Sequence, residues 1–444
     1  MTVAEETSYI QSLLNGRQPV GELPDYVASM KEAAREQIDA LPFPTTKHEE
    51  WKYTNLKPLT KHNFVSADEA SGAGHADEIE KLFLAEADKH RLVFVNGNFR
   101  SDLSNVKDLP EGTVLGNLAD YANDGHKAIE ENLGQIAQYE EDIFEPFNTY
   151  NFKDGAFVYI PSETKIEAPI HLLFVQTSAN ETYYVTPRVL IVGGHHAEAN
   201  IIEDYAALDE NVYFTAPVTE ISLGENSHFT HVKLQQESKQ AYHISRIASN
   251  IKRDSEYHSY AIHLGSHLSR SDVKAVLQDE GTHCTMDGLV MIRSDQLSDT
   301  HSVMDHANPN CTSHQLHKCI VDDEATSVFN GKIFVKKHAQ KTDAFQENRN
   351  LQLSDDAEVY TKPQLEIFAD DVSCSHGATI GQMDEEQMFY LKARGMKPET
   401  AREILTYGFA LDVIESLPGE HLKKRLTKEV QKYARSGKKA ESTV

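Results

Sequence analysis

The stretch TKPQLEIFADDVSCSHGATIG, residues 361–381, contains the residue types of this chain best suited to chemistry. Cys374 and His376 are two positions apart, so on an extended strand both side chains leave from the same face. A thiol beside an imidazole, with Asp370 and Asp371 just upstream, suits soft metals and iron–sulfur chemistry. We therefore take Cys374 and His376 as candidate metal ligands, supported by the two aspartates.

Two ligands do not complete a tetrahedral metal site. The missing ligands must come from elsewhere in the chain or from another chain. For Cys374 the alternative is simple packing, because a free cysteine is often buried as a small hydrophobic residue. His376, which follows two serines and the cysteine, is poor core material. We expect Gly377 to let the chain turn sharply and to leave the imidazole uncrowded.

A second group of cysteines and histidines lies in the run CTSHQLHKC, residues 311–319. On a strand, His314 faces away from Cys311, His317 and Cys319, so one extended segment cannot direct all four at one ion. A structural or surface role is favoured over a zinc site there. The pair His195-His196 follows two glycines and is expected to form a turn.

Composition excludes several classes of protein. The chain has 444 residues and a formal net charge of −26, which argues against nucleic acid and against anionic lipid as partners. Four scattered cysteines fit a reducing cytosol rather than a disulfide framework, so a cytoplasmic location is expected. No apolar run approaches the length of a membrane span. There is no phosphate-binding GxxxxGK[ST] and no GxGxxG that opens a helix, so the chain itself should not hydrolyse ATP.

The pattern of elements divides the chain into three regions. Residues 1–154 read as mixed and mainly helical. From Gly155 to residue 382, short apolar runs alternate with turn residues and no helix-length pattern intervenes, which excludes a sheet with helical crossovers. A sandwich gives a similar pattern, but so long a series fits a β-solenoid at least as well. Residues 383–444 return to helix, with Asp384 as a cap and Pro398 at the start of a second helix.

Two of the expected helices have expected inner faces. The first begins near Pro24 and should turn its apolar residues inward: Tyr26, Met30, Ala33, Ala34 and Ile38. The helix after Asp384 should have an apolar side formed by Met388, Phe389 and Leu391. A basic run follows in the last helix, and against so acidic a body it is a possible docking surface for a partner.

The same stretch, with GKIFVKKHAQKTDAFQENRNLQLS before it, closely resembles the SufB/SufD family of iron–sulfur cluster assembly proteins. EEWKYTNL near the N-terminus and FYLKARGMKPETAREILTYGFA near the C-terminus resemble that family too, so the resemblance covers nearly the whole chain. Gly377 favours the SufD branch, because SufB usually has an acidic residue after the histidine. Cys319 departs from the pattern, since the family tends to have glycine there.

The resemblance implies a mainly β fold: a right-handed parallel β-helix core between N-terminal and C-terminal helical domains. It implies a non-enzymatic subunit that pairs with a SufB-like homologue and carries a SufC-like ABC ATPase on its C-terminal helices, with ATP bound only through that ATPase. His376 would lie at the interface of the pair, with Cys374 nearby, and a transient cluster would be shared with the homologue rather than held by the isolated chain. A homodimer of the isolated chain is also plausible.

Candidates for ATPase docking follow from the resemblance of the C-terminal helices, namely Tyr390, Ile404, Leu405, Tyr407 and Phe409. A rival hypothesis is a β-helix hydrolase or lyase acting on polysaccharide, with Glu366, Asp370 and Asp371 as acid and base candidates. The single tryptophan for sugar stacking and the helices at both ends argue against it.

Overall fold

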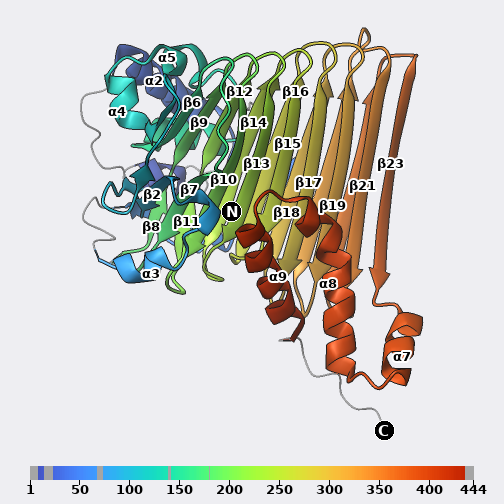
Figure 1. Cartoon of the computed structure of the whole chain (residues 1–444). Coiled ribbons are helices and arrows are strands. Elements are labelled where there is room, and N and C mark those ends of the chain that lie inside the picture. The colour runs from blue at the N-terminus through green and yellow to red at the C-terminus, as the bar shows by residue number, and fades with distance from the viewer. Residues whose placement is uncertain (1–8, 15–23, 68–73, 139–141, 180, 436–444) are drawn as a thin grey trace.

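The chain winds into a parallel β-solenoid, seen from the side in the computed structural model of Figure 1. The structure describes residues 9–14, 24–67, 74–138, 142–179 and 181–435. Two parallel sheets run along its length, and the chain passes from one sheet to the other in every coil. The prediction of a parallel β-helix between helical regions is therefore confirmed, and the sandwich alternative is wrong.

Each sheet contributes eight strands to the coils. In sheet A these are β6 (Gly155–Ile160), β9 (Arg188–Gly193), β12 (Val218–Leu223), β14 (Tyr242–Ile251), β16 (Leu268–Leu277), β18 (Leu297–His306), β20 (Thr326–Val335) and β22 (Glu358–Ile367). In sheet B they are β7 (Ile170–Gln176), β10 (Glu198–Ala207), β13 (His228–Gln236), β15 (Glu256–His263), β17 (His283–Ile292), β19 (Thr312–Val321), β21 (Thr342–Gln352) and β23 (Val372–Gln382). Two short strands, β8 (Tyr183–Val185) and β11 (Tyr213–Thr215), flank the early coils.

Alternate residues of each strand point into the lumen between the sheets. The largest buried cluster lies there and joins side chains from both sheets, among them Ile170, Leu172, Ile191, Tyr257 and Ile333. Because coils stack in register, each lumen residue sits against its counterpart in the next coil. A residue's place in this stack therefore fixes what it contacts.

The N-terminal third closes the first end of the solenoid and adds strands to both sheets. β5 (Val114–Asn117) pairs with β6, and β2 (His90–Val95) pairs with β7, while the small strands β1 (Val65–Ser66), β3 (Asn98–Phe99) and β4 (Asn105–Val106) extend the edges. The helices of this region are α2 (Asp25–Ala40), α3 (Ala76–Glu80), α4 (Leu118–Asn123), α5 (Lys127–Asn132) and α6 (Phe144–Asn151). Three short 3-10 turns, Glu49–Trp51, Leu59–Lys61 and Ala85–Ala87, complete it.

The expected inner face of α2 is partly wrong. Val27, Lys31, Ala34 and Ile38 are its buried residues, whereas Ala33 is exposed. A charged residue such as Lys31 is expected on the exposed face of a helix, but here it is buried. Its Nζ donates to the carbonyl oxygens of Thr149 and Phe152 at the end of α6. These bonds satisfy the buried ammonium group.

The segment EEWKYT lies on the outer face of sheet A and reaches its last strand. Trp51 covers the buried guanidinium of Arg270 at 3.9 Å. Two residues further along, Tyr53 stacks on Tyr360 of β22 with ring centroids 4.1 Å apart. The single tryptophan thus anchors the N-terminal region to the coils.

The C-terminal helices α8 (Pro398–Ser416) and α9 (Glu420–Arg435) pack on the outer face of sheet B (Figure 1). α7 (Glu385–Ala393) stands away from the sheet beside α8. The cap prediction is confirmed, because the carboxylate of Asp384 accepts from the backbone N–H groups of Glu386 and Gln387. The predicted apolar side of α7 is wrong as an inner face, since none of its residues is buried. In the part of the chain that the structure describes, no helix is both long and apolar enough to cross a membrane.

Candidate functional site at the C-terminal end of the solenoid

The last coil of the solenoid is uncovered at its outer edge. Within the described residues, β22 pairs only with β20 and β23 pairs only with β21. β23 is 11 residues long and leaves its outer row of backbone N–H and C=O groups unpaired. β22 contains Pro363, a residue that sheets tolerate mainly at edges. An unprotected edge of this length presents backbone groups that can pair with another strand.

Cys374 and His376 lie in β23 on the lumen side of this edge. Cys374 pairs with Ala344 and His376 with Gln346, and both partners are fully buried in β21. The intervening residue of β21, Phe345, is exposed on the outer face. The prediction that Cys374 and His376 share one face is therefore confirmed.

The Cys374 thiol is half-buried and packs against the lumen core. Burial raises the pKa of this thiol, and the nearby carboxylate of Asp343 raises it further. Because the thiolate is the form that binds metal, both effects weaken Cys374 as a ligand in the isolated chain.

His376 has the opposite character. Its side chain is exposed, and it forms no hydrogen bond or ion pair with any residue that the structure describes. Its neighbour in the stack is Gln346, whose Nε2 donates to Oε1 of Gln315 at 3.2 Å. The buried Oε1 of Gln346 has no partner among the described residues. An imidazole N–H is a suitable donor to that oxygen, an arrangement that orients histidine ligands at metal sites.

Gly377 is not at a turn, and that expectation is wrong. It lies within β23, opposite Glu347, and its φ is not positive. A Cβ at this position would meet no atom within 4 Å. The backbone is extended here, so any residue can adopt it.

The two aspartates lie apart from His376. Asp370 and Asp371 are exposed in the corner between β22 and β23, where the backbone N–H of Asp371 donates to Oε1 of Gln340 at 2.8 Å. At about 3.3 Å per residue, five residues of strand separate Asp371 from His376 by about 16 Å. The aspartates shape the corner rather than contact the imidazole. Glu366, the third acid of the hydrolase hypothesis, forms an ion pair with Lys332 at 3.2 Å.

The cysteines of residues 311–319 are structural, as expected. Cys311, His317 and Cys319 are buried while His314 is exposed and stacks on Phe345. Burial raises the pKa of Cys319 to about 11, which keeps the thiol protonated and unreactive. The turn predicted for His195 and His196 is also confirmed.

The ATPase-docking candidates divide into two sets. Tyr390 and Ile404 are exposed on α7 and α8, with 54% and 43% of their surface accessible. Leu405 is half-buried, whereas Tyr407 and Phe409 pack partly against the outer face of sheet B. Sequence reasoning missed the most exposed apolar side chain of this part, Phe389, because its position in an amphipathic pattern suggested burial.

Two further apolar residues at the open edge were also missed. Phe368 in the corner and Ile380 in β23 have 58% and 49% of their surface exposed. Both follow strand-like spacing, which alone does not distinguish a buried strand from an edge strand. They lie near opposite ends of β23, so each adds exposed apolar surface to a different part of the edge.

The structure is a parallel β-solenoid with an open last coil, on whose lumen side Cys374 and His376 lie. Comparisons with known proteins give the family of the chain. Residues 174–409 match the family described as "SUF system FeS cluster assembly, SufBD core domain", and residues 4–172 match "SufBD protein N-terminal region". The chain belongs to the SufBD family of iron–sulfur cluster assembly proteins.

Similar proteins carry the same description. A SufBD family protein of Synechocystis is 37% identical over 90% of this chain and 89% of its own length. The iron–sulfur cluster assembly protein SufD of Escherichia coli is 33% identical over 86% of this chain and 87% of its own. SufD of Bacillus subtilis is 26% identical over 97% and 99%. Because the chain belongs to this family, the hypothesis of a polysaccharide hydrolase is no longer supported.

Proposed function

We propose that this chain is the SufD-like, non-enzymatic subunit of an iron–sulfur cluster assembly complex. The observation that carries this proposal is the uncovered last coil, where His376 lies on the lumen side of the 11-residue strand β23, whose outer edge has no partner strand among the described residues. A SufB-like homologue with an equivalent edge would pair with β22 and β23 and cover the exposed apolar residues there. The pairing would bring the partner's ligands to His376.

The cluster would be transient and shared across this interface. Neutral imidazole is a competent iron ligand. Cys374 contributes less, because its thiol is held protonated in the isolated chain. The isolated chain therefore holds no cluster stably, and cluster formation requires the pair.

The ATPase would dock on the C-terminal helical domain, residues 383–444. We distinguish this domain from the N-terminal region (1–154) and from the coils (155–382). Phe389 and Tyr390 are exposed on α7, which stands away from the sheet, and Ile404 is exposed on α8, which packs on sheet B. These exposed apolar residues suit a SufC-like ABC ATPase, through which alone the complex would use ATP. All four cysteines are free, in keeping with a cytoplasmic location.

Co-purification with a SufB-like protein and a SufC-like ATPase tests the assembly, and His376→Ala tests the site. We expect the His376→Ala complex to form normally, since the side chain has no partner in the described structure, and its cluster yield to fall at least tenfold. Cluster yield is measured by absorbance and by iron and sulfide content after reconstitution. His283→Ala, another exposed histidine of sheet B, is the matched control and should keep full yield.

Normal cluster yield in the His376→Ala complex would remove His376 from cluster formation. Failure of the wild-type chain to bind a SufB-like protein would contradict the pairing itself. In that case a second copy of the chain could pair with β23 instead, and the resulting homodimer would be measurable as a change in molecular mass.

A further inference from the structure

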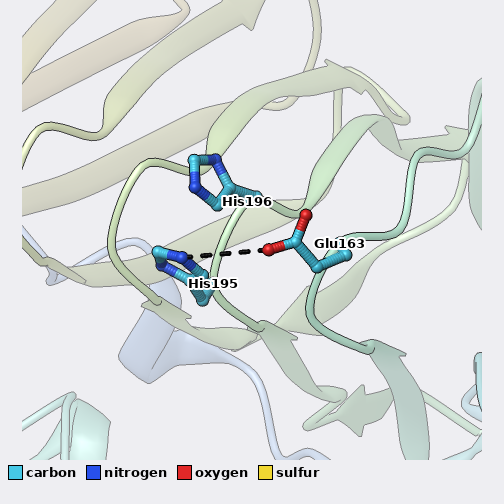
Figure 2. A group of neighbouring side chains, drawn as sticks. All are labelled: Glu163, His195 and His196. Carbon is cyan, nitrogen blue, oxygen red and sulfur yellow. Dashed lines mark ion pairs between the residues drawn. The ribbon is translucent and has the colours of Figure 1, made fainter.

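A group of metal-ligating side chains lies at the other end of the solenoid, in a corner between the sheets. Glu163 comes from the loop after β6, and His195 and His196 come from the turn between β9 and β10. One ligand atom from each of these residues lies within 4.8 Å of the other two. Figure 2 shows the carboxylate of Glu163 pointing toward the two imidazole rings.

We propose that Glu163, His195 and His196 bind a divalent transition-metal ion of the zinc class. Two imidazoles and one carboxylate are a donor set that such ions prefer. Water would complete the coordination, because all three side chains are exposed. The site is separate from the cluster site, and six strand spacings of about 4.8 Å between β10 and β23 put the two about 29 Å apart.

The distances favour a shared ion over a direct bond. Nε2 of His195 lies 3.9 Å from Oε1 of Glu163, which is too long for a hydrogen bond. Two ligand atoms bound to one tetrahedral zinc lie about 3.4 Å apart, given metal–ligand bonds near 2.1 Å. A small rotation of exposed side chains closes that difference. The ring centroids of His195 and His196 are 4.0 Å apart, and one nitrogen of each ring lies within 4.8 Å of the other, so both can reach the same ion.

A nearby group of the same residue types behaves differently. In the outer face of sheet B, Glu256 bonds His228 at 3.1 Å and His258 at 2.8 Å. That carboxylate and those rings already satisfy one another directly. In the corner group the corresponding lone pairs stay available to a cation.

The backbone of the corner holds the group in place. The N–H of Glu163 donates to the carbonyl of His195 at 2.8 Å, and the N–H of His195 donates to Oγ of Ser162 at 3.1 Å. The N–H of His196 donates to the carbonyl of Glu225 in the following coil at 2.9 Å. The three ligands therefore sit on stacked, mutually bonded coils, and a bound ion would clip the first coil to the second.

The corner holds one residue with positive φ in each of the first seven coils, namely Glu163, His196, Asn226, Asp254, Gly281, Asn310 and Lys341. Asparagine, aspartate and histidine adopt this conformation more readily than glutamate does. Lys341 shows that the position also accepts a long side chain. The proposed site therefore depends on the convergence of the three side chains and not on the residue types at this position.

Zinc titration of the metal-free full-length chain tests the proposal. We expect calorimetry to show one Zn²⁺ per chain that is lost, or bound at least tenfold more weakly, in His196→Ala and in Glu163→Gln. Loss with Glu163→Gln would report the carboxylate itself, because the amide keeps the shape. Zn²⁺ should also raise the melting temperature of the wild-type chain and not of these variants.

Two comparisons keep the test specific. His283→Ala removes an exposed histidine elsewhere on sheet B and should leave both stoichiometry and affinity unchanged. His376→Ala removes the candidate ligand at the open end of the solenoid, so any zinc bound there should be lost. The ion bound by Glu163, His195 and His196 should persist in this variant. Co²⁺ bound in place of Zn²⁺ should give visible absorption bands, and His195→Ala should abolish them. Because the side chain of His195 is exposed, this variant is expected to fold normally, so loss of the bands would report loss of a ligand.

Equal zinc stoichiometry and affinity in the wild type, His196→Ala and Glu163→Gln would overturn the proposal. So would a cobalt spectrum that disappears with His376→Ala and persists with His195→Ala. Neither outcome would bear on the pairing and cluster functions proposed above, because those depend on the opposite end of the solenoid.

Discussion

The two ends of the solenoid are built differently. At the first end, β5 and β2 pair with the outermost strands β6 and β7, and helices of the N-terminal third pack over them. At the last end, β22 and β23 have no such cover within the described residues. The hydrophobic core runs into both ends and has half-buried residues at each, Phe99 and Leu109 at the first end and Leu365 and Val372 at the last.

This difference separates stability from function. A covered end satisfies backbone groups within the chain, so it needs no partner. An open end keeps its backbone groups and apolar side chains available, which favours pairing at the cost of a vulnerable edge. The residues with candidate chemistry for cluster assembly, Cys374 and His376, lie at the open end.

The strongest test of this contrast places a charge at each end. Ile380→Lys puts an ammonium group at the open edge, where pairing would bury it without a partner, and such a charge is costly. We expect the dissociation constant for a SufB-like protein to rise at least about 1,000-fold, since a loss of about 4 kcal/mol corresponds to that factor. Calorimetry or analytical ultracentrifugation measures it.

Val106→Lys is the matched control at the first end. Val106 in β4 has 40% of its surface exposed, close to the 49% of Ile380. It should leave the affinity unchanged. If both substitutions weaken binding equally, or neither does, pairing does not use the open end.

Core truncations should also distinguish the ends. Leu172 in β7 is fully buried between β2 and β10, so Leu172→Ala should cost about 3 kcal/mol in the free energy of unfolding. Leu365 in β22 is half-buried, so Leu365→Ala should cost about 1 kcal/mol in the isolated chain. Urea unfolding midpoints measure both.

The partner should change this ranking. When a SufB-like homologue covers β22, Leu365→Ala should destabilise the complex more than the isolated chain, whereas the effect of Leu172→Ala should stay the same. A cost for Leu365→Ala that does not change on complex formation would mean that the partner leaves the lumen end uncovered.

Much of this contrast was within reach of the sequence. Strand runs without helical crossovers indicated stacked parallel strands, and the spacing of Cys374 and His376 placed both on one face. The length of a coil could not be predicted from the sequence, because it varies along the solenoid. Hydrogen-bonded residues in neighbouring coils are 28 residues apart for His228 and Glu256 but 31 apart for Gln315 and Gln346. A variable period leaves no repeat to detect.

Other features depend on tertiary context. Gly377 looked like a turn residue but lies in a strand, because the coil continues past it to Gln382. The apolar residues of α7 looked like an inner face, yet α7 has no sheet beneath it. The Glu163, His195 and His196 group joins residues of two coils, so its convergence could not be seen from spacing alone.

Histidines inside the covered part of the lumen should make the chain sensitive to acid. His317 is fully buried beside Phe329, and burial lowers its pKa from 6.5 to about 3. Its pKa is thus lower in the folded than in the unfolded chain, so stability is fully present above pH 6.5 and is lost as the pH falls toward 3. We expect up to about 1.4 kcal/mol lost per pH unit from this group.

Melting curves of the wild type and His317→Leu between pH 6.5 and 4 check this slope. The variant removes the titrating group while keeping an apolar side chain of similar size, so its slope should be shallower. Phe329→Leu changes the neighbouring ring and keeps the histidine, so its slope should match the wild type. Equal slopes in all three chains would mean that water reaches His317.

The smallest expected effect concerns Gly377, on which the predicted assignment to the SufD branch depends. Its Cβ would meet nothing within 4 Å, and Glu347 is its neighbour in β21. Gly377→Asp should therefore fold normally and lose about 0.5 kcal/mol through repulsion from Glu347, while the neutral Gly377→Asn should lose less. If the open edge is an interface, the aspartate should also lower the affinity for a SufB-like partner more than the asparagine does, although neither changes the lumen. Equal affinities for the two variants would show that the residue after His376 lies outside the paired surface, and the branch distinction would then depend on some other part of the edge.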